Sequence, residues 1–76
     1  MATVETRIRF TFPGDRHATV PEGSTVMFCD RVTTEVAENV VAGDSVCVNG
    51  CSGQVESVHR ADVQDDGSIN LTELSS

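Results

Sequence analysis

Residues 4–12 read VETRIRFTF, and this stretch decides the fold class of the 76-residue chain. Ile8, Phe10 and Phe12 occupy alternate positions, and charged or hydroxyl side chains fill the positions between them. A two-residue period is typical of a β-strand with one face in the protein core and the other in water. We therefore predict a strand over residues 4–12 whose large apolar side chains are buried.

Short runs of turn-forming residues divide the rest of the chain into further strands. Pro, Gly, Asn and Asp are concentrated at four places, and each of these residue types favours a reversal of the backbone. The pair Asn49 and Gly50 favours a tight hairpin between the segments that flank it. The predicted turns cover residues 13–15, 21–23, 49–50 and 65–68. The predicted strands between them cover residues 17–20, 24–28, 45–48, 54–64 and 69–74.

Residues 30–41 permit two interpretations. Val32, Val36 and Val40 are spaced as on one face of a helix, but they also share the parity of a strand. The β-branched residues of this segment favour extended structure. The alternative is a single helical turn with Asp30 as its N-cap.

These segments predict an all-β fold of six or seven short strands in a single domain over residues 1–76. Two architectures fit, a small antiparallel barrel of the SH3-like kind and a compact sandwich. Aromatic residues make up only 4% of the chain, so valine must supply most of a thin core, and domains of this size commonly gain stability from a metal or a partner. The predicted core residues are Val4, Ile8, Phe10, Phe12, Val26, Phe28, Val46, Val48, Val55, Val58, Ile69 and Leu71.

Twelve acidic against five basic residues give the chain a formal net charge of −7. This charge opposes binding to nucleic acid and to anionic lipid. The sequence contains no run of about 18 apolar residues that would cross a membrane, and its first residues lack the pattern of a signal peptide. We expect no membrane partner, and a location in the cytoplasm or in a particle assembled there.

The three cysteines and two histidines are the candidates for a metal site. Cys29, Cys47 and Cys51 with His59, or with His17 as the alternative fourth ligand, have the composition of a Cys3His zinc site. Zinc would stabilise a small domain with a thin core. Two other interpretations stay open, a disulfide between Cys47 and Cys51 and cysteines that pack as small apolar side chains.

Residues 62–73 nearly reproduce the spacing of an EF-hand calcium loop. In that geometry Asp62, Asp66 and Glu73 would supply carboxylates, and the glycine between them would allow the sharp turn. The alternative is an Asp-Gly β-turn that joins two strands. Apart from zinc and calcium, we expect no cofactor.

One segment resembles a known family. Glycines and valines recur in the order Gly-Asp-x-Val-x-Val followed by Gly-x-Val-x-x-Val, which resembles the KOW-type segment of SH3-like barrels. The resemblance covers residues 43–58, about a fifth of the chain. It implies glycines at the turns and valines in the core of an SH3-like barrel, with an RNA or protein partner. The residues that carry it are Gly43, Asp44, Val46, Val48, Gly53, Val55 and Val58.

The acidic residues are spread along the sequence, and a small β domain has little room for a substrate pocket. We therefore expect a structural or assembly module and not an enzyme. In size and strand content the chain resembles, by type, the small β-rich structural proteins of tailed viruses. That resemblance implies a virion component for capsid decoration, head–tail joining or the tail, docked on a coat or tail protein or assembled as a homo-oligomer. The alternative is a free cytoplasmic adaptor, SH3-like or zinc-stabilised, that binds a protein or RNA.

Overall fold

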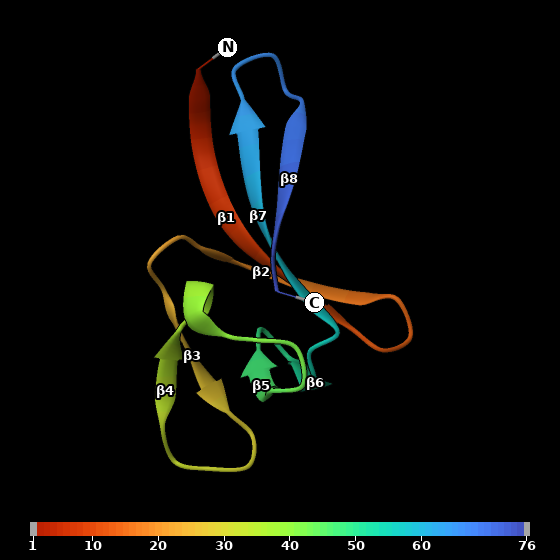
Figure 1. Cartoon of the computed structure of the whole chain (residues 1–76). Coiled ribbons are helices and arrows are strands. Elements are labelled where there is room, and N and C mark those ends of the chain that lie inside the picture. The colour runs from red at the N-terminus through yellow and green to blue at the C-terminus, as the bar shows by residue number, and fades with distance from the viewer. Residues whose placement is uncertain (1, 76) are drawn as a thin grey trace.

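The computed structural model describes residues 2–75, which form two four-stranded antiparallel sheets (Figure 1). Sheet A has the strand order β2-β1-β7-β8, and sheet B has the order β4-β3-β5-β6. The elements are β1 (Thr3–Phe12), β2 (Arg16–Pro21), β3 (Thr25–Phe28), β4 (Thr34–Val36), the 3-10 turn η1 (Ala37–Asn39), β5 (Ser45–Val48), β6 (Cys51–Gln54), β7 (Ser57–Gln64) and β8 (Ile69–Ser75).

The all-β prediction is confirmed, and the architecture is a sandwich of eight strands. The predicted number of six or seven strands was too low, because residues 30–41 and 51–54 each contribute a short strand. Among the described residues no strand of one sheet pairs with a strand of the other, so the alternative of a closed SH3-like barrel does not form.

The two ends of the chain build one sheet and its middle builds the other. The first two and last two strands form sheet A, where β1 pairs with β7 over nearly its whole length. The four strands between them form sheet B, which the chain enters after Pro21 and leaves at Val55. The return is fixed by backbone hydrogen bonds, from Val55 N to Asp44 O at 2.9 Å and from Glu56 N to Thr11 O at 2.7 Å.

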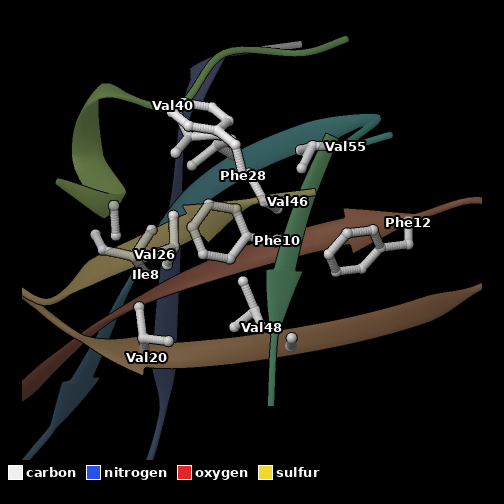
Figure 2. Close-up of a cluster of buried hydrophobic side chains, with 13 residues drawn as sticks. Ile8, Phe10, Phe12, Val20, Val26, Phe28, Val40, Val46, Val48 and Val55 are labelled. Atoms are coloured by element: carbon white, nitrogen blue, oxygen red, sulfur yellow. The ribbon is translucent and has the colours of Figure 1, made fainter. Parts of the chain in front are cut away.

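The core lies between the two sheets and consists mainly of valine with three phenylalanines (Figure 2). Phe10 and Phe12 of β1 are fully buried, as alternation in residues 4–12 predicts. Val40, which follows η1, is also buried and was not predicted to be in the core. Nine of the twelve predicted core residues are buried, namely Ile8, Phe10, Phe12, Val26, Phe28, Val46, Val48, Val55 and Val58.

The other three predicted core residues are exposed, which corrects the prediction. Val4, Ile69 and Leu71 have 63%, 59% and 49% of their surface accessible to solvent. Ile69 and Leu71 pair with Val63 and Ala61 and so lie on the outer face of sheet A, which points away from sheet B. Val4 lies at the irregularity of β1 between Thr3 and Glu5. Figure 1 shows the ends of β1, β7 and β8 extending beyond sheet B, at the top.

We call this projecting part the arm, defined as residues 3–7 of β1, 61–64 of β7 and 69–71 of β8. Strand β2 pairs with β1 only from Arg7 onward, so most of the arm has three strands. The arm accounts for the elongated shape of the molecule, whose principal extents are 40 × 24 × 20 Å.

The hairpin predicted at Asn49 and Gly50 is confirmed. Both residues have a positive φ, 48° at Asn49 and 84° at Gly50, and Val48 pairs with Cys51 across the turn. Two consecutive residues with positive φ characterise the type I′ turn, whose twist matches that of the adjoining strands.

Residues 30–41 contain both extended and helical structure. The segment pairs with β3 through β4, and a single 3-10 turn follows at Ala37–Asn39. The prediction that Asp30 caps a helical turn was wrong, because η1 begins seven residues later and has no side-chain cap. Asp30 instead forms an ion pair with Arg31 at 3.2 Å.

Candidate functional site

The four residues predicted to bind zinc lie on three separate surfaces. Cys29 and Cys47 are exposed on the outer face of sheet B, since they share the parity of Met27 and not that of the buried Phe28. Cys51 pairs with Val48 and packs against the core. His59 lies on β7 in sheet A. Within residues 2–75 no three His, Cys, Asp or Glu side chains approach closely enough to hold a metal ion, so the arrangement gives the zinc prediction no support.

The cysteines also do not form the disulfide considered between Cys47 and Cys51. All three are free, and these two point to opposite faces of the β5–β6 hairpin because they pair with Ser52 and Val48 respectively. Packing as a small apolar side chain is correct for Cys51, whose Sγ is 3.8 Å from the carbonyl oxygen of His17. It is wrong for Cys29 and Cys47, which are exposed.

The residues that resemble a calcium loop form a hairpin turn. Asp66 Oδ1 accepts hydrogen bonds from Ser68 Oγ at 2.7 Å and from Ser68 N at 3.0 Å, and these bonds lower the pKa of Asp66. In the pairing of β7 with β8, Asp62 lies opposite Asn70, and His59 lies opposite Glu73. Asp62 and Glu73 therefore lie on opposite faces of sheet A and cannot coordinate one ion, so the β-turn alternative is correct.

Cys29 and Cys47 are close neighbours on the outer face of sheet B. Met27 lies directly opposite Cys47, and Cys29 N donates a hydrogen bond to Ser45 O at 2.9 Å, which places Cys29 diagonally from Cys47. A side-chain hydrogen bond with Cys29 raises the pKa of Cys47 above its ordinary value of 9.0. A raised pKa keeps the thiol protonated, which is the opposite of what a nucleophilic cysteine requires.

The outer side of the arm presents a row of apolar side chains that does not belong to the core. Ala61 of β7 lies between Arg7 of β1 and Leu71 of β8, and Val63 is paired with Ile69 in the next row. Ala61 is 8% exposed but is not a member of the core cluster, because it is covered from the outer side. We call this surface the arm face, and it comprises Glu5, Arg7, Ala61, Val63, Ile69 and Leu71.

A row of polar side chains borders the arm face. Thr19, Arg9, His59 and Glu73 lie opposite one another across all four strands of sheet A. The row thus carries one basic residue, Arg9, and one acidic residue, Glu73, on either side of His59. Beside this row Arg7 forms an exposed ion pair with Glu5 at 3.1 Å.

Strand β8 is the longest edge strand of the sandwich, with seven residues. One side of its backbone pairs with β7, and the other side carries the N–H and C=O groups of an unpaired edge. Proteins commonly protect such edges with charges, prolines or bulges. Between Ile69 and Thr72 the edge has no charged residue and no proline, and its irregularity lies further on, near Glu73.

The described residues enclose no pocket that would hold a small substrate. Over the same residues, the structure has no helix long and apolar enough to cross a membrane. Comparison with known proteins gives no match to a family model, to a curated protein or to a solved structure.

The sequence alone identifies neither the arm face nor the neighbouring pair Cys29 and Cys47 on the outer face of sheet B. Ile69 and Leu71 alternate as core residues do, so their pattern alone could not assign them to the arm face. The proximity of Cys29 and Cys47 depends on the pairing of β3 with β5, which are separated by sixteen residues of other structure.

Proposed function

We propose that the chain is a non-enzymatic assembly module that docks through the arm face and the β8 edge onto a larger protein. One observation carries this proposal. Ile69 and Leu71 occupy alternate positions of β8, an edge strand that pairs only with β7, and their side chains remain 59% and 49% exposed. A strand with this pattern normally has its apolar face covered.

The energetics favour a partner that covers the arm face. Full burial of a Leu or Ile side chain contributes about 1.5–3 kcal/mol relative to full exposure. Since Ile69 and Leu71 keep about half of their surface in water, much of this contribution is unused in the isolated chain. A domain of this size has a small core, so the free energy that burial of these two side chains would add is substantial compared with the stability of the isolated chain.

The surface also indicates the chemistry of the partner. An added strand would pair with the free backbone groups of β8, and an apolar side chain from it would cover Leu71. In the polar row beside the arm face, Glu73 is the member nearest to this edge, so a basic or hydroxyl side chain of the added strand would complement it. The partner is therefore a protein with an exposed strand that carries an apolar side chain and a basic or hydroxyl side chain on one face.

At the finer level we propose a virion component, used in capsid decoration, head–tail joining or the tail, with a coat or tail protein as its partner. Such particles present many copies of the same surface, and a small sandwich with a projecting arm suits a module that repeats on it. A free cytoplasmic adaptor differs in one measurable respect, because it must be stably folded as a monomer.

Native mass spectrometry and urea denaturation of the purified full chain test this proposal together. We expect either an oligomer or a monomer whose free energy of unfolding is below about 3 kcal/mol, which is the range of small domains that lack a partner. A monomer with a free energy of unfolding well above that value would overturn the assembly proposal and favour the adaptor.

A further inference from the structure

Three sulfur-bearing side chains lie together on the outer face of sheet B. Met27 of β3 is directly opposite Cys47 of β5, and Cys29 follows two residues after Met27 on the same face. All three are exposed, Met27 by 56% of its surface. These residues contain three of the five sulfur atoms of the chain, since it has three Cys and two Met.

The pairing of the strands sets the distances within this group. Side chains directly opposite each other in an antiparallel pair have Cβ atoms about 4.5–5.5 Å apart, which applies to Met27 and Cys47. Diagonal neighbours such as Cys29 and Cys47 are about 7–8 Å apart at their Cα atoms. Their thiols are nevertheless close enough to share the hydrogen bond that raises the pKa of Cys47.

We propose that Cys29, Cys47 and Met27 form a surface site for a soft monovalent metal ion, Cu(I). The two thiolates are the principal ligands and the thioether is the third. Binding replaces both thiol protons: two R–SH groups and one Cu⁺ give one [Cu(SR)2]⁻ unit and release two H⁺ into solvent, with no change in oxidation state.

The geometry favours a bridging ion over a disulfide. A disulfide joins sulfurs about 2.05 Å apart and requires Cα atoms within about 4.4–6.8 Å, which is shorter than the diagonal spacing. Two metal–sulfur bonds of about 2.3 Å, the length known for zinc thiolates, span roughly twice the disulfide distance. An ion thus connects Cys29 and Cys47 without pulling β3 toward β5.

The ligand set favours Cu(I) over Zn²⁺. Thiolate and thioether sulfurs are soft donors that select Cu(I), whereas a structural zinc site takes four N, O or S ligands in a tetrahedron. Within residues 2–75 no third His, Cys, Asp or Glu joins the two cysteines. The one carboxylate adjacent in sequence, Asp30, is engaged by Arg31 at 3.2 Å.

The electrostatic setting is also suitable for a cation. By register, the strand positions on the outer face of sheet B, all within the described residues, carry no charged side chain. These positions are Thr25, Met27, Thr34, Val36, Ser45, Cys47, Ser52 and Gln54. The basic residue nearest in sequence is Arg31, whose guanidinium lies over the Phe28 ring and pairs with Asp30 at 3.2 Å, which offsets its charge. The net charge of −7 attracts cations to the molecule as a whole.

The test is an anaerobic titration of the reduced full chain with Cu(I) in competition with bicinchoninate, whose Cu(I) complex is coloured. We expect one Cu(I) per chain for the wild type and the same value for Cys51→Ser, the matched control at the third cysteine. Cys29→Ser and Cys47→Ser should each abolish competition with the chelator, and Met27→Leu should weaken it. X-ray absorption of the wild-type complex should show sulfur neighbours only.

Several results would overturn the site. These are failure of the reduced wild type to compete with bicinchoninate, equal loss of binding in Cys51→Ser, or retention of one Zn²⁺ per chain as tightly as Cu(I). Since Cys29 and Cys47 are exposed, serine at either position should leave the fold intact, and the circular dichroism spectrum of each variant verifies this. A Cys29→Ser or Cys47→Ser variant that keeps the wild-type spectrum and still binds one Cu(I) per chain would also contradict the proposal.

Discussion

Leu71 of β8 lies directly opposite Ala61 of β7 on the outer side of the arm. Ala61 is 8% exposed, whereas Leu71 is 49% exposed, so the leucine covers its neighbour but is itself uncovered. The same alternation that places Phe10 in the core thus places Leu71 on the surface. The two residues lie on opposite faces of sheet A: Phe10 faces sheet B, whereas Leu71, like Ala61, faces away from it.

This contrast predicts different effects of truncating the two side chains. Phe10→Ala should lower the free energy of unfolding by about 3–5 kcal/mol, because it creates a cavity in the core. Leu71→Ala should lower it by less than about 1 kcal/mol, because the side chain is half exposed. Urea denaturation of the isolated chain compares the two variants: Leu71→Ala should keep a cooperative unfolding transition, whereas Phe10→Ala should lose it if the wild-type free energy of unfolding is below about 3 kcal/mol. Equal losses would mean that the arm face is covered in the isolated chain.

The β5–β6 hairpin depends on a glycine. Gly50 has φ of 84°, in the left-handed region, where an L-residue with a side chain costs about 1–2 kcal/mol. Gly50→Ala should therefore destabilise the chain by about that amount, although no atom lies within 4 Å of the added methyl group. Asn49→Gly is the matched control, since glycine also accepts a positive φ, and it should change the stability by less. A neutral Gly50→Ala variant in thermal denaturation would contradict the turn geometry.

The turn between β7 and β8 predicts a pH effect at Asp66. Hydrogen bonds from the side chain and backbone of Ser68 hold the pKa of Asp66 below its ordinary value of 3.8. A lowered pKa in the folded state stabilises the fold at pH values above the ordinary pKa, and this contribution is lost as the pH falls through the lowered value. In an NMR titration, Ser68→Ala should move the pKa of Asp66 up toward 3.8. An unchanged pKa would show that the serine hydroxyl does not act on the carboxylate.

The thiol pair predicts a reactivity difference that does not require any metal. The hydrogen bond with Cys29 raises the pKa of Cys47, and only the thiolate reacts with iodoacetamide. Cys29→Ala should therefore speed the alkylation of Cys47 at pH 8, as followed by peptide mass spectrometry. Cys51→Ala serves as the control and should leave the rate at Cys47 unchanged. If both variants gave the wild-type rate, the two thiols would not interact in solution.

The sequence predicts the strands of this fold better than their environment. Alternation in residues 4–12 and the turn residues at Asn49 and Gly50 are local signals, and the structure confirms both. Whether an alternating strand has a covered face is a property of the whole fold. The pattern of Ile69 and Leu71 predicts core residues, because nothing in it indicates that these side chains face away from sheet B.

The candidate sites show the same difference between local signals in the sequence and properties of the whole fold. Cysteine composition suggested a cluster of Cys29, Cys47, Cys51 and His59, but strand parity separates Cys51 from Cys47, and His59 belongs to the other sheet. The proximity of Cys29 to Cys47 follows from the pairing of β3 with β5. The sequence gives no local signal of that pairing, because the segment between these strands contains both β4 and η1.

Site-specific photocrosslinking tests docking through the arm most directly. A benzophenone amino acid replaces Leu71 on the arm face or, as the matched exposed apolar control, Val32 in the loop after β3, and each variant is irradiated in the cells or particles that contain the chain. The account predicts one discrete adduct of the chain with a larger protein from position 71, none from position 32, and loss of the adduct when Ile69→Glu is added. No adduct from position 71, or equal adducts from both positions, would contradict it.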